Sequence, residues 1–334
     1  MAVIISGNGI DMGNNPVSNA SKIDGVVINE NNENVATTSS LVGFKNYIIN
    51  GNFDIWQRGT SFTGLTNGTY SSDRWVVYDA TNNINYNVIR NAGVFNTGYG
   101  ATYSFNSGTG ERSVIQFIEN VTRFKVGSNV TISFEAYTNS TPYTVAVTLQ
   151  GVKGVWASRT GEVTPSNIAL TNIKTKYSVT LPISDWTSLG IDWAHLEDTK
   201  LALKFNLGVE TNGRDFILGN VQLEKGSVAT PFEQRPIELE LSLCQRYYEY
   251  SGGNHHWATM DQPGASSSMY KFNPIIKYSV TKRVVPTLVL TEHNGFAGVQ
   301  IIGQTTTGFD FRNVNTNVTG YNDKYFRWTA DAEL

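Results

Sequence analysis

Apolar and polar residues alternate in several separate runs of this chain, and this period of two constrains the fold more than any other feature. Residues 130–137 (VTISFEAY) show the alternation over a full run, and it recurs over residues 144–149, 177–181 and 201–209. Because successive side chains of a strand point to opposite faces, the pattern indicates antiparallel strands with one buried face. Gly- and Asn-rich breaks such as NSGTGE and TNGRD separate the runs, as turns would. We therefore predict an all-β protein built around a jelly-roll β-sandwich.

The alternation also predicts which side chains form the core of that sandwich. The apolar members of two runs should point into one interior, with two tryptophans in or beside it. These residues are Val130, Ile132, Phe134, Leu201, Leu203 and Phe205, with Trp56 and Trp75. A shift of one residue in either strand would expose this set instead of burying it.

Composition and charge limit the partners of the chain. Only 16% of the 334 residues are charged, and the net charge is −3. No basic patch for a nucleic acid is visible, and no apolar run approaches the length of a membrane span. The N-terminus has no basic stretch before its short apolar run, so it does not resemble a secretion signal. We expect no nucleic-acid partner and no membrane insertion.

Four segments of different character follow one another. Residues 1–45 hold few large apolar side chains, and we expect an extended attachment segment that orders against a partner; a disordered tail is the alternative. Residues 46–235 contain the alternating runs and should form the sandwich. Residues 236–250 (PIELELSLCQRYYEY) place apolar residues at helical spacing after a proline, which predicts a connecting helix. Residues 251–334 return to short strand-like runs and predict a small second β domain.

No recognised catalytic motif is present in the chain, so we expect a protein that is not an enzyme and that needs no cofactor. The single cysteine, Cys244, lies in the apolar helix candidate, and we expect it to be a small core residue. Glycoside hydrolysis needs two carboxylates across a cleft. Acidic residues stand beside tryptophans over residues 185–198 (DWTSLGIDWAHLED), but spacing along the sequence does not fix that geometry.

Aromatic residues in irregular stretches are the candidates for glycan contact. An aromatic ring offers a large, rigid apolar face on which a sugar ring can stack. Trp156, Trp186, Trp193 and Trp257 lie in or near such stretches, and Tyr137 falls on the polar face of its strand. We predict that these five residues include the glycan site, with packing in the structure as the competing role of each.

A structural calcium ion is a further alternative that the sequence leaves open. Asn50, Asn52 and Asp54 lie near the start of the sandwich, and Asp215 and Glu224 lie near its end. Calcium prefers several oxygen ligands drawn from different loops. We predict no other metal site.

Several stretches taken together resemble the tail-fibre and receptor-binding proteins of tailed bacteriophages and related prophage proteins. They are NYIINGNFDIWQRGTSF from Asn46, then DRW from Asp73, VQLEKGSVATPFEQRP from Val221, and LCQRYYEY from Leu243. The later stretches VTKRVVPT and WTADAEL also resemble the C-terminal half of that family. The resemblance covers residues 46–334, and it implies a carbohydrate-binding-module-like jelly roll in the first part.

The resemblance also implies a function and a set of partners. It implies a tail fibre of the virion, made in the host cytoplasm, that attaches to host surface polysaccharide or lipopolysaccharide. Other phage tail or baseplate proteins and two further copies of the chain, in a homotrimer, would be its protein partners. The alternatives are a structural or decorating virion protein without glycan affinity and, with the weakest support, a polysaccharide-degrading tail spike.

The motif residues that carry the resemblance are expected to be structural rather than to contact sugar. They are Trp56, Gln57, Arg58, Gly59, Asp73, Arg74 and Trp75.

Overall fold

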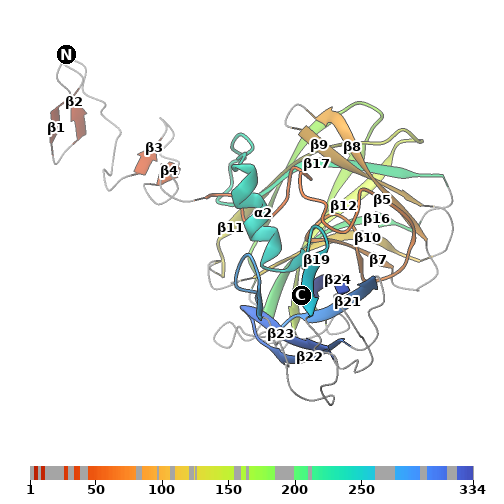
Figure 1. Cartoon of the computed structure of the whole chain (residues 1–334). Helices are drawn as coiled ribbons and strands as arrows, with labels where there is room; N and C mark the ends of the chain where they lie inside the picture. The colour runs from red at the N-terminus through yellow and green to blue at the C-terminus, as the bar shows by residue number, and fades with distance from the viewer. Residues whose placement is uncertain are drawn as a thin grey trace, which may run out of the picture.

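The structure, a computed structural model, is almost entirely β and confirms the expected fold class (Figure 1). It describes residues 4–6, 9–11, 26–28, 34–37, 44–79, 85–95, 98–105, 110–119, 124, 126–153, 159–162, 165–184, 199–209, 213–259, 275–293, 299–313 and 322–333. Within the range expected for the attachment segment, it describes two short antiparallel pairs, β1 (Ile4–Ser6) with β2 (Gly9–Asp11) and β3 (Val26–Ile28) with β4 (Asn34–Thr37).

Two antiparallel sheets stack to form the sandwich. The six-stranded sheet has the order β15-β11-β17-β9-β8-β5, and the seven-stranded sheet has the order β13-β12-β16-β10-β7-β6, with β14 paired to β12. The strands of the first sheet are β5 (Ser61–Leu65), β8 (Tyr86–Phe95), β9 (Gly98–Phe105), β11 (Asn129–Tyr137), β15 (Thr175–Pro182) and β17 (Asp215–Lys225). Those of the second are β6 (Thr69–Tyr70), β7 (Trp75–Asp79), β10 (Arg112–Ile118), β12 (Tyr143–Lys153), β13 (Arg159–Glu162), β14 (Ser166–Leu170) and β16 (Thr199–Gly208).

The predicted core set lies in one buried cluster between these sheets, so the expected strand faces are confirmed. Phe205 of the seven-stranded sheet packs against Phe134 and Phe216 of the six-stranded sheet, with ring centroids 5.0 and 5.7 Å apart. Trp75 extends this stack toward Phe53, at 5.1 Å. Aromatic rings from both sheets therefore fill the centre of the sandwich.

The polar face of the six-stranded sheet is covered as well, which the alternation did not indicate. Thr131 and Ser133 are buried although they point away from the core. The chain after β17 crosses this face: the Thr131 hydroxyl donates to the Gly226 carbonyl, and the backbone N–H of Glu233 donates to Gln222. One-sided packing was therefore the wrong expectation here, because a later segment of the chain supplies the second cover.

The motif stretch that begins at Asn46 and the one that begins at Val221 lie side by side, but the first is not a strand over residues 44–60. Asn46 donates to the Val221 carbonyl and accepts from the backbone N–H of Leu223, and the N–H of Val221 donates to the Gly51 carbonyl. Asn50 has a φ of 57°, in the left-handed region, which turns the backbone away from a strand path. Hydrogen bonds from the Asn46 side chain, together with isolated backbone bonds, thus take the place of a regular ladder at this point.

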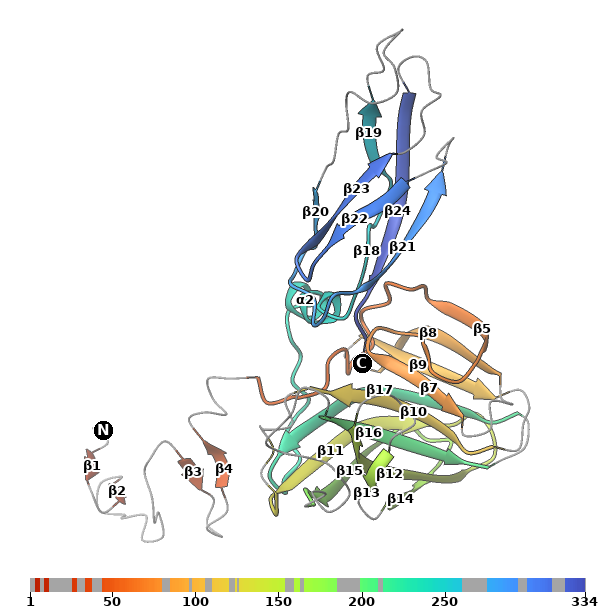
Figure 2. The same ribbon diagram turned by 90° about the horizontal axis from the view of Figure 1, so that it is seen from below.

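The strands from β18 to β24 form a second β unit, here called the C-terminal module. It stands on one end of the sandwich, with helix α2 (Ile237–Gln245) at the boundary (Figure 2). One sheet of the module has the order β18-β24-β19, with β21 also paired to β24, and the other has the order β20-β23-β22. The strands are β18 (Tyr248–Tyr250), β19 (His255–Thr259), β20 (Ile275–Lys277), β21 (Thr287–His293), β22 (Val299–Gln304), β23 (Gly308–Asn313) and β24 (Asn322–Asp331).

The predicted helix over residues 236–250 is too long. It starts after Pro236 as expected and ends at Gln245, and Tyr248–Tyr250 form β18, which pairs with β24. Strand pairing with the end of the chain overrides the helical spacing of these residues.

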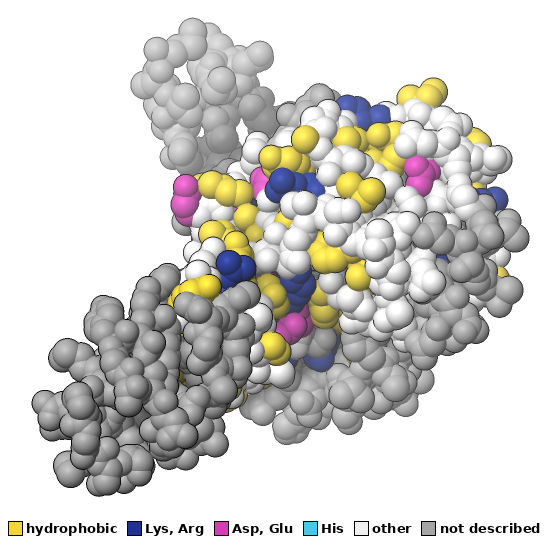
Figure 3. Space-filling view, turned by 45° about the vertical axis from the view of Figure 1, so that its right-hand side comes forward, with side chains coloured by type: hydrophobic (Ala, Val, Ile, Leu, Met, Phe, Trp, Pro, Cys, Tyr) yellow, Lys and Arg dark blue, Asp and Glu magenta, His cyan; other side chains and the backbone are white. Residues whose placement is uncertain are grey.

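On the face shown in Figure 3, charged side chains are few and scattered among uncharged ones, in keeping with the composition. Of the described residues, none belongs to a helix with the length and hydropathy of a membrane span.

Candidate functional site

Arg58 of the sandwich reaches into the C-terminal module. Its guanidinium lies 3.3 Å from a Glu333 carboxylate oxygen, 3.4 Å from Asp331 and 4.0 Å from Asp73, and it stacks 3.6 Å from the centroid of the Tyr248 ring. Burial opposes the charge of Arg58, but the three carboxylates outweigh it, so its pKa lies above the ordinary value. Arg58 is therefore a permanent cation that joins the two parts of the protein.

Arg74 makes a second bridge of the same kind. It pairs with Glu333, donates to the Phe117 carbonyl at 2.7 Å, and lies 3.4 Å from the centroid of the Tyr247 ring. Its side chain is only 1% exposed. One carboxylate, that of Glu333, thus serves two buried guanidinium groups.

Asp73 and Gln57 complete the sandwich side of this junction. The Asp73 carboxylate accepts hydrogen bonds from the backbone N–H and the side-chain amide of Gln57, both at 2.7 Å. The same Gln57 amide donates to the carbonyl of Tyr248. Burial raises the pKa of Asp73, against the pull of Arg58. Of the motif residues expected to be structural, Gln57, Arg58, Asp73 and Arg74 form the docking surface for the C-terminal module.

Helix α2 is fixed to the sandwich by Glu240. This buried carboxylate accepts from the backbone N–H of Asn50 and pairs with Arg235 at 3.2 Å. One turn later Cys244 is fully buried, and burial raises the pKa of its thiol well above the ordinary value. Cys244 is therefore a packing residue, as expected, and not a reactive thiol.

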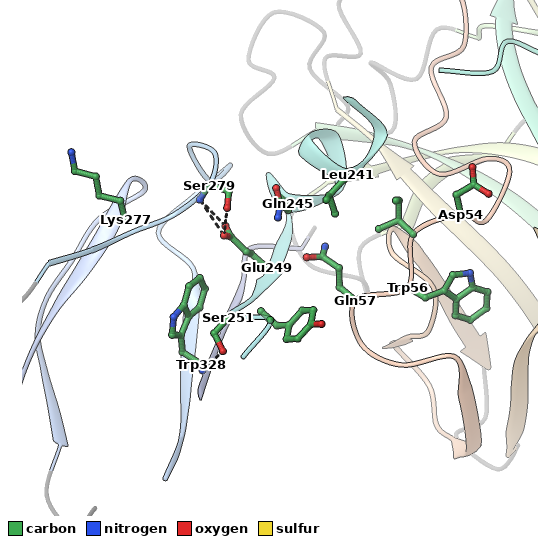
Figure 4. Close-up of a pocket in the computed structure, with 13 residues that line it drawn as sticks. Asp54, Trp56, Gln57, Leu241, Gln245, Glu249, Ser251, Lys277, Ser279 and Trp328 are labelled. Atoms are coloured by element: carbon green, nitrogen blue, oxygen red, sulfur yellow. Dashed lines mark hydrogen bonds between the residues drawn. The ribbon is translucent and has the colours of Figure 1, made fainter. Parts of the chain in front are cut away.

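A cleft with a volume of about 560 Å³ lies between the sandwich, α2 and the C-terminal module (Figure 4). Its lining residues are Asp54, Ile55, Trp56, Gln57, Leu241, Gln245, Glu249, Tyr250, Ser251, Gly252, Lys277, Ser279 and Trp328. In Figure 4, Gln57 and Trp56 lie on the sandwich side, and Ser251, Trp328 and Lys277 lie on the opposite side. The cleft exists only because the two parts are docked.

Among the aromatic residues of the cleft, Tyr250 is the one with an accessible ring. It is 44% exposed, whereas Trp56 and Trp328 are 9% and 3% exposed. The Trp56 indole donates to the Phe53 carbonyl and stacks on Phe62, and Trp328 packs in the core of the C-terminal module. The tryptophans are therefore buried behind opposite walls of the cleft, and Tyr250 offers a stacking face.

The lining of the cleft also contains polar side chains. Gln57, Gln245 and Lys277 supply amide and ammonium donors to the lining. Burial raises the pKa of Asp54, although a hydrogen bond from Asn52 lowers it. Glu249 is already engaged, since it accepts from the backbone and hydroxyl of Ser279 and pairs with Lys282 (Figure 4). The Gln57 amide already donates to Asp73 and to the Tyr248 carbonyl, so Gln245 and Lys277 are the side-chain donors that the lining offers to a ligand.

The structure describes few of the predicted glycan residues. Trp156, Trp186 and Trp193 lie outside the described residues, as does the acidic stretch 185–198, and Trp257 is described only as part of the backbone of β19. Tyr137 ends β11, is partly exposed, and makes an edge-to-face contact with the buried ring of Phe95 at 6.3 Å. It lies on the six-stranded sheet and does not line the cleft.

The candidate calcium ligands do not form one site. Asp215 and Glu224 stand at opposite ends of β17, about 30 Å apart at about 3.3 Å per residue. Asp215 accepts from the Thr138 hydroxyl at 2.6 Å, and Glu224 accepts from the hydroxyl of Thr230 at 2.7 Å. In the described part of the chain, no group of three or more His, Cys, Asp or Glu side chains is placed to hold a metal ion.

Comparisons with known proteins give similarity of fold. No protein-family model and no curated protein matches the chain. A solved structure described as "CBM4 structure and function" is 17% identical over 53% of this chain and 97% of its own, with a TM-score of 0.35. The family 11 carbohydrate-binding module of Clostridium thermocellum, solved with a β-1,3-1,4-mixed-linked tetrasaccharide, is 12% identical over 52% and 99%, with a TM-score of 0.33.

A third similar structure is the enzymatically active domain of tailspike protein 4 of Bacteriophage CBA120. It is 15% identical over 54% of this chain and 21% of its own, with a TM-score of 0.33. Likeness at this level does not assign a site or a ligand, because one fold serves many functions.

Tyr250 was not among the glycan-contacting residues predicted from the sequence. It lies in the LCQRYYEY stretch, where helical spacing and the family motif both indicated a structural role. The available signal was the cluster of three tyrosines: the arginines stack on Tyr247 and Tyr248, whereas Tyr250, two residues further along β18, is exposed.

Proposed function

We propose that the protein is a receptor-binding protein of a bacteriophage tail that binds a glycan of the host surface in the cleft. The observation that carries the glycan part is the exposed ring of Tyr250 in a cleft lined by side-chain amides. Sugars present one apolar face and a rim of hydroxyls, which an aromatic face and amide groups complement. The phage part rests on the sequence motifs between Asn46 and Leu334.

The test of the cleft is Tyr250→Ala, assayed against an array of bacterial capsular polysaccharides and lipopolysaccharides. Loss of a stacking ring should weaken binding by about 1 kcal/mol or more, which is about fivefold. Phe44→Ala is the matched control, because Phe44 is an aromatic residue that is 58% exposed outside the cleft. Equal binding by Tyr250→Ala and the parent would remove the cleft from the proposal.

The predicted aromatics provide the competing location for the same function. Tyr137→Ala, Trp156→Ala, Trp186→Ala, Trp193→Ala and Trp257→Ala belong in the same assay. A loss in one of these variants, with Tyr250→Ala unchanged, would move the glycan site away from the cleft. A parent protein that binds no polysaccharide would favour a structural or decorating virion protein instead.

Attachment and assembly are the second half of the proposal. The N-terminal segment would join the virion, and three copies would associate around spaced Ile and Val residues that cannot form a core alone. Deleting residues 1–40 should then abolish incorporation into the particle and weaken self-association. Light scattering on the intact protein measures this directly, and a monomer at micromolar concentration would disprove the trimer.

The alternative of a polysaccharide-degrading tail spike is tested with the same protein and the same polysaccharide. Incubation of the bound polysaccharide with the protein should release no new reducing ends if the protein only binds.

A further inference from the structure

The end of the chain is held between the two parts of the protein. Its backbone belongs to the C-terminal module, since Arg283 donates to the carbonyls of Ala332 and Glu333, both at 3.1 Å, and Ala332 donates to Tyr247. Its acidic side chains point the other way, toward Arg58 and Arg74 of the sandwich. The segment therefore links the two parts: its backbone bonds to the C-terminal module, and its acidic side chains bond to the sandwich.

This link is continuous with one wall of the cleft. Strand β24 pairs with β18 so that Asp331 faces Tyr248, Ala330 faces Glu249 and Thr329 faces Tyr250. Two residues of that wall, Glu249 and Tyr250, line the cleft, and so does Trp328 of β24. A displacement of the chain end would therefore move the wall with it.

The sandwich side of the cleft is connected to the same acidic residues, Asp331 and Glu333. Gln57 lines the cleft, and its amide is held between Asp73 and the carbonyl of Tyr248. Asp73 in turn lies beside Arg58, which contacts both Asp331 and Glu333. Each wall of the cleft is thus tied to the group of carboxylates at the end of the chain.

We propose that Asp331 and Glu333 form a carboxylate clip, whose closure on Arg58 and Arg74 sets the distance between the two walls of the cleft. These two acids are positioning residues, which act on a ligand only through Tyr248–Tyr250 and Gln57. The effect on ligand binding rests on the proposed function, whereas the closure itself does not.

The burial of Arg74 and Glu333 makes this pair the decisive part of the clip, since Asp331 is 44% exposed. The side chains of Arg74 and Glu333 are 1% and 5% exposed. Removing one partner of such a pair leaves an uncompensated buried charge, which costs far more than the loss of an exposed ion pair. With Glu333 neutralised, separation of the two walls would return both guanidiniums to water, so the open arrangement gains population.

Hydrogen exchange on the full-length protein tests the clip without any ligand. In Glu333→Gln, the amides of Tyr248–Ser251 and of Asp54–Gln57 should exchange about tenfold faster or more, while β11 and β17 keep their protection. Glu238→Gln is the matched control, because Glu238 is an exposed acid on α2. Unchanged exchange at Tyr248–Ser251 would overturn the clip, and so would an equal loss of protection throughout the sandwich.

Binding of the same variants to the polysaccharide array completes the test. The clip predicts that Glu333→Gln weakens the same glycan that Tyr250→Ala weakens, although Glu333 does not line the cleft. Faster exchange with unchanged binding would show that the clip does not position the site. Faster exchange in a protein that binds no glycan would uphold the closure and reject the proposed function.

Discussion

The interior of the sandwich and the junction with the C-terminal module are both buried, yet opposite chemistry fills them. In the interior, Phe134, Phe205 and Phe216 pack ring against ring. In the junction, Arg58 and Arg74 lie on tyrosine rings and pair with carboxylates. Apolar packing tolerates many arrangements of similar volume, whereas paired charges are favourable in one geometry only. The sandwich interior therefore stabilises the fold, and the junction specifies how the second module docks.

The difference matters most for the C-terminal module, because the apolar cluster formed by its described residues is small. Its buried apolar cluster consists of Tyr278, Phe309, Phe311, Phe326, Trp328 and Ala330. The sandwich cluster contains several times as many side chains. Loss of the junction should therefore affect the module far more than the sandwich.

The largest effect is expected in the apolar interior, from Phe205→Ala. Phe205 is fully buried and contacts rings from the opposite sheet, so the change should lower the free energy of unfolding by about 3–5 kcal/mol. Urea unfolding followed by far-ultraviolet circular dichroism measures this. Val209→Ala is the control, since Val209 is 62% exposed, and a similar loss in both variants would contradict the described core.

In the junction, Arg58→Met should lower stability by about 3 kcal/mol, because it leaves Asp73 buried without a cation and leaves Glu333 with Arg74 alone. Combined with Glu333→Gln, the loss should be smaller than the sum of the single losses, with a coupling of about 1 kcal/mol or more. The exposed Arg327→Met is the control. Additive losses would mean that the two residues act independently, and that the junction is not one charge network.

A close backbone approach within the sandwich, between Gly51 and Val221 of β17, is tested by Gly51→Ala. A Cβ at Gly51 would lie 2.1 Å from the Val221 carbonyl oxygen, against the strand that forms the sandwich centre. The substitution should cost about 1–3 kcal/mol through forced displacement. Gly253→Ala is the matched control, because a Cβ there would meet no atom within 4 Å. Similar midpoints of thermal unfolding for the two variants would contradict this approach.

Those features of the sandwich that depend on local strand geometry were predictable from the sequence. The period of two placed Val130, Ile132 and Phe134 on the core face of β11, because strand geometry alone decides which side chains share a face. The burial of Thr131 on the other face was not predictable in this way, since a segment about a hundred residues later covers it. The residue types on this face of β11 do not indicate that a later segment covers them.

The junction and the cleft depend on contacts that are remote in sequence. Arg58 and Arg74 stood out as motif residues, but their partner Glu333 lies 275 and 259 positions further along the chain. Tyr250 fell within an expected helix, and only the pairing of β18 with β24 turns it into a strand residue. Sequence reasoning identified the docking residues without their partner, and it missed the exposed ring of the cleft.

The smallest expected effect concerns pH and Asp54, which lies in the cleft where the two regions meet. Burial raises the pKa of its carboxyl in the folded protein above the ordinary value of about 4. A raised folded-state pKa favours the folded state while the group is protonated in both states, below about pH 4. That contribution is lost as the pH rises through the folded-state pKa, so at neutral pH the ionised Asp54 opposes folding slightly.

Asp54→Asn should therefore raise the unfolding midpoint slightly at pH 7 and leave it unchanged below about pH 4. Asp215→Asn is the contrast, because the Asp215 carboxylate lies outside the cleft and accepts hydrogen bonds from the Thr138 hydroxyl and the Asn139 backbone, which the substitution would weaken. Thermal unfolding of both variants across this pH range measures the difference. If Asp54→Asn were destabilising at pH 7, the ionised Asp54 carboxylate would be stabilised by its neighbours. The edge of the cleft would then resemble the junction, where paired charges are favourable, and not the apolar interior.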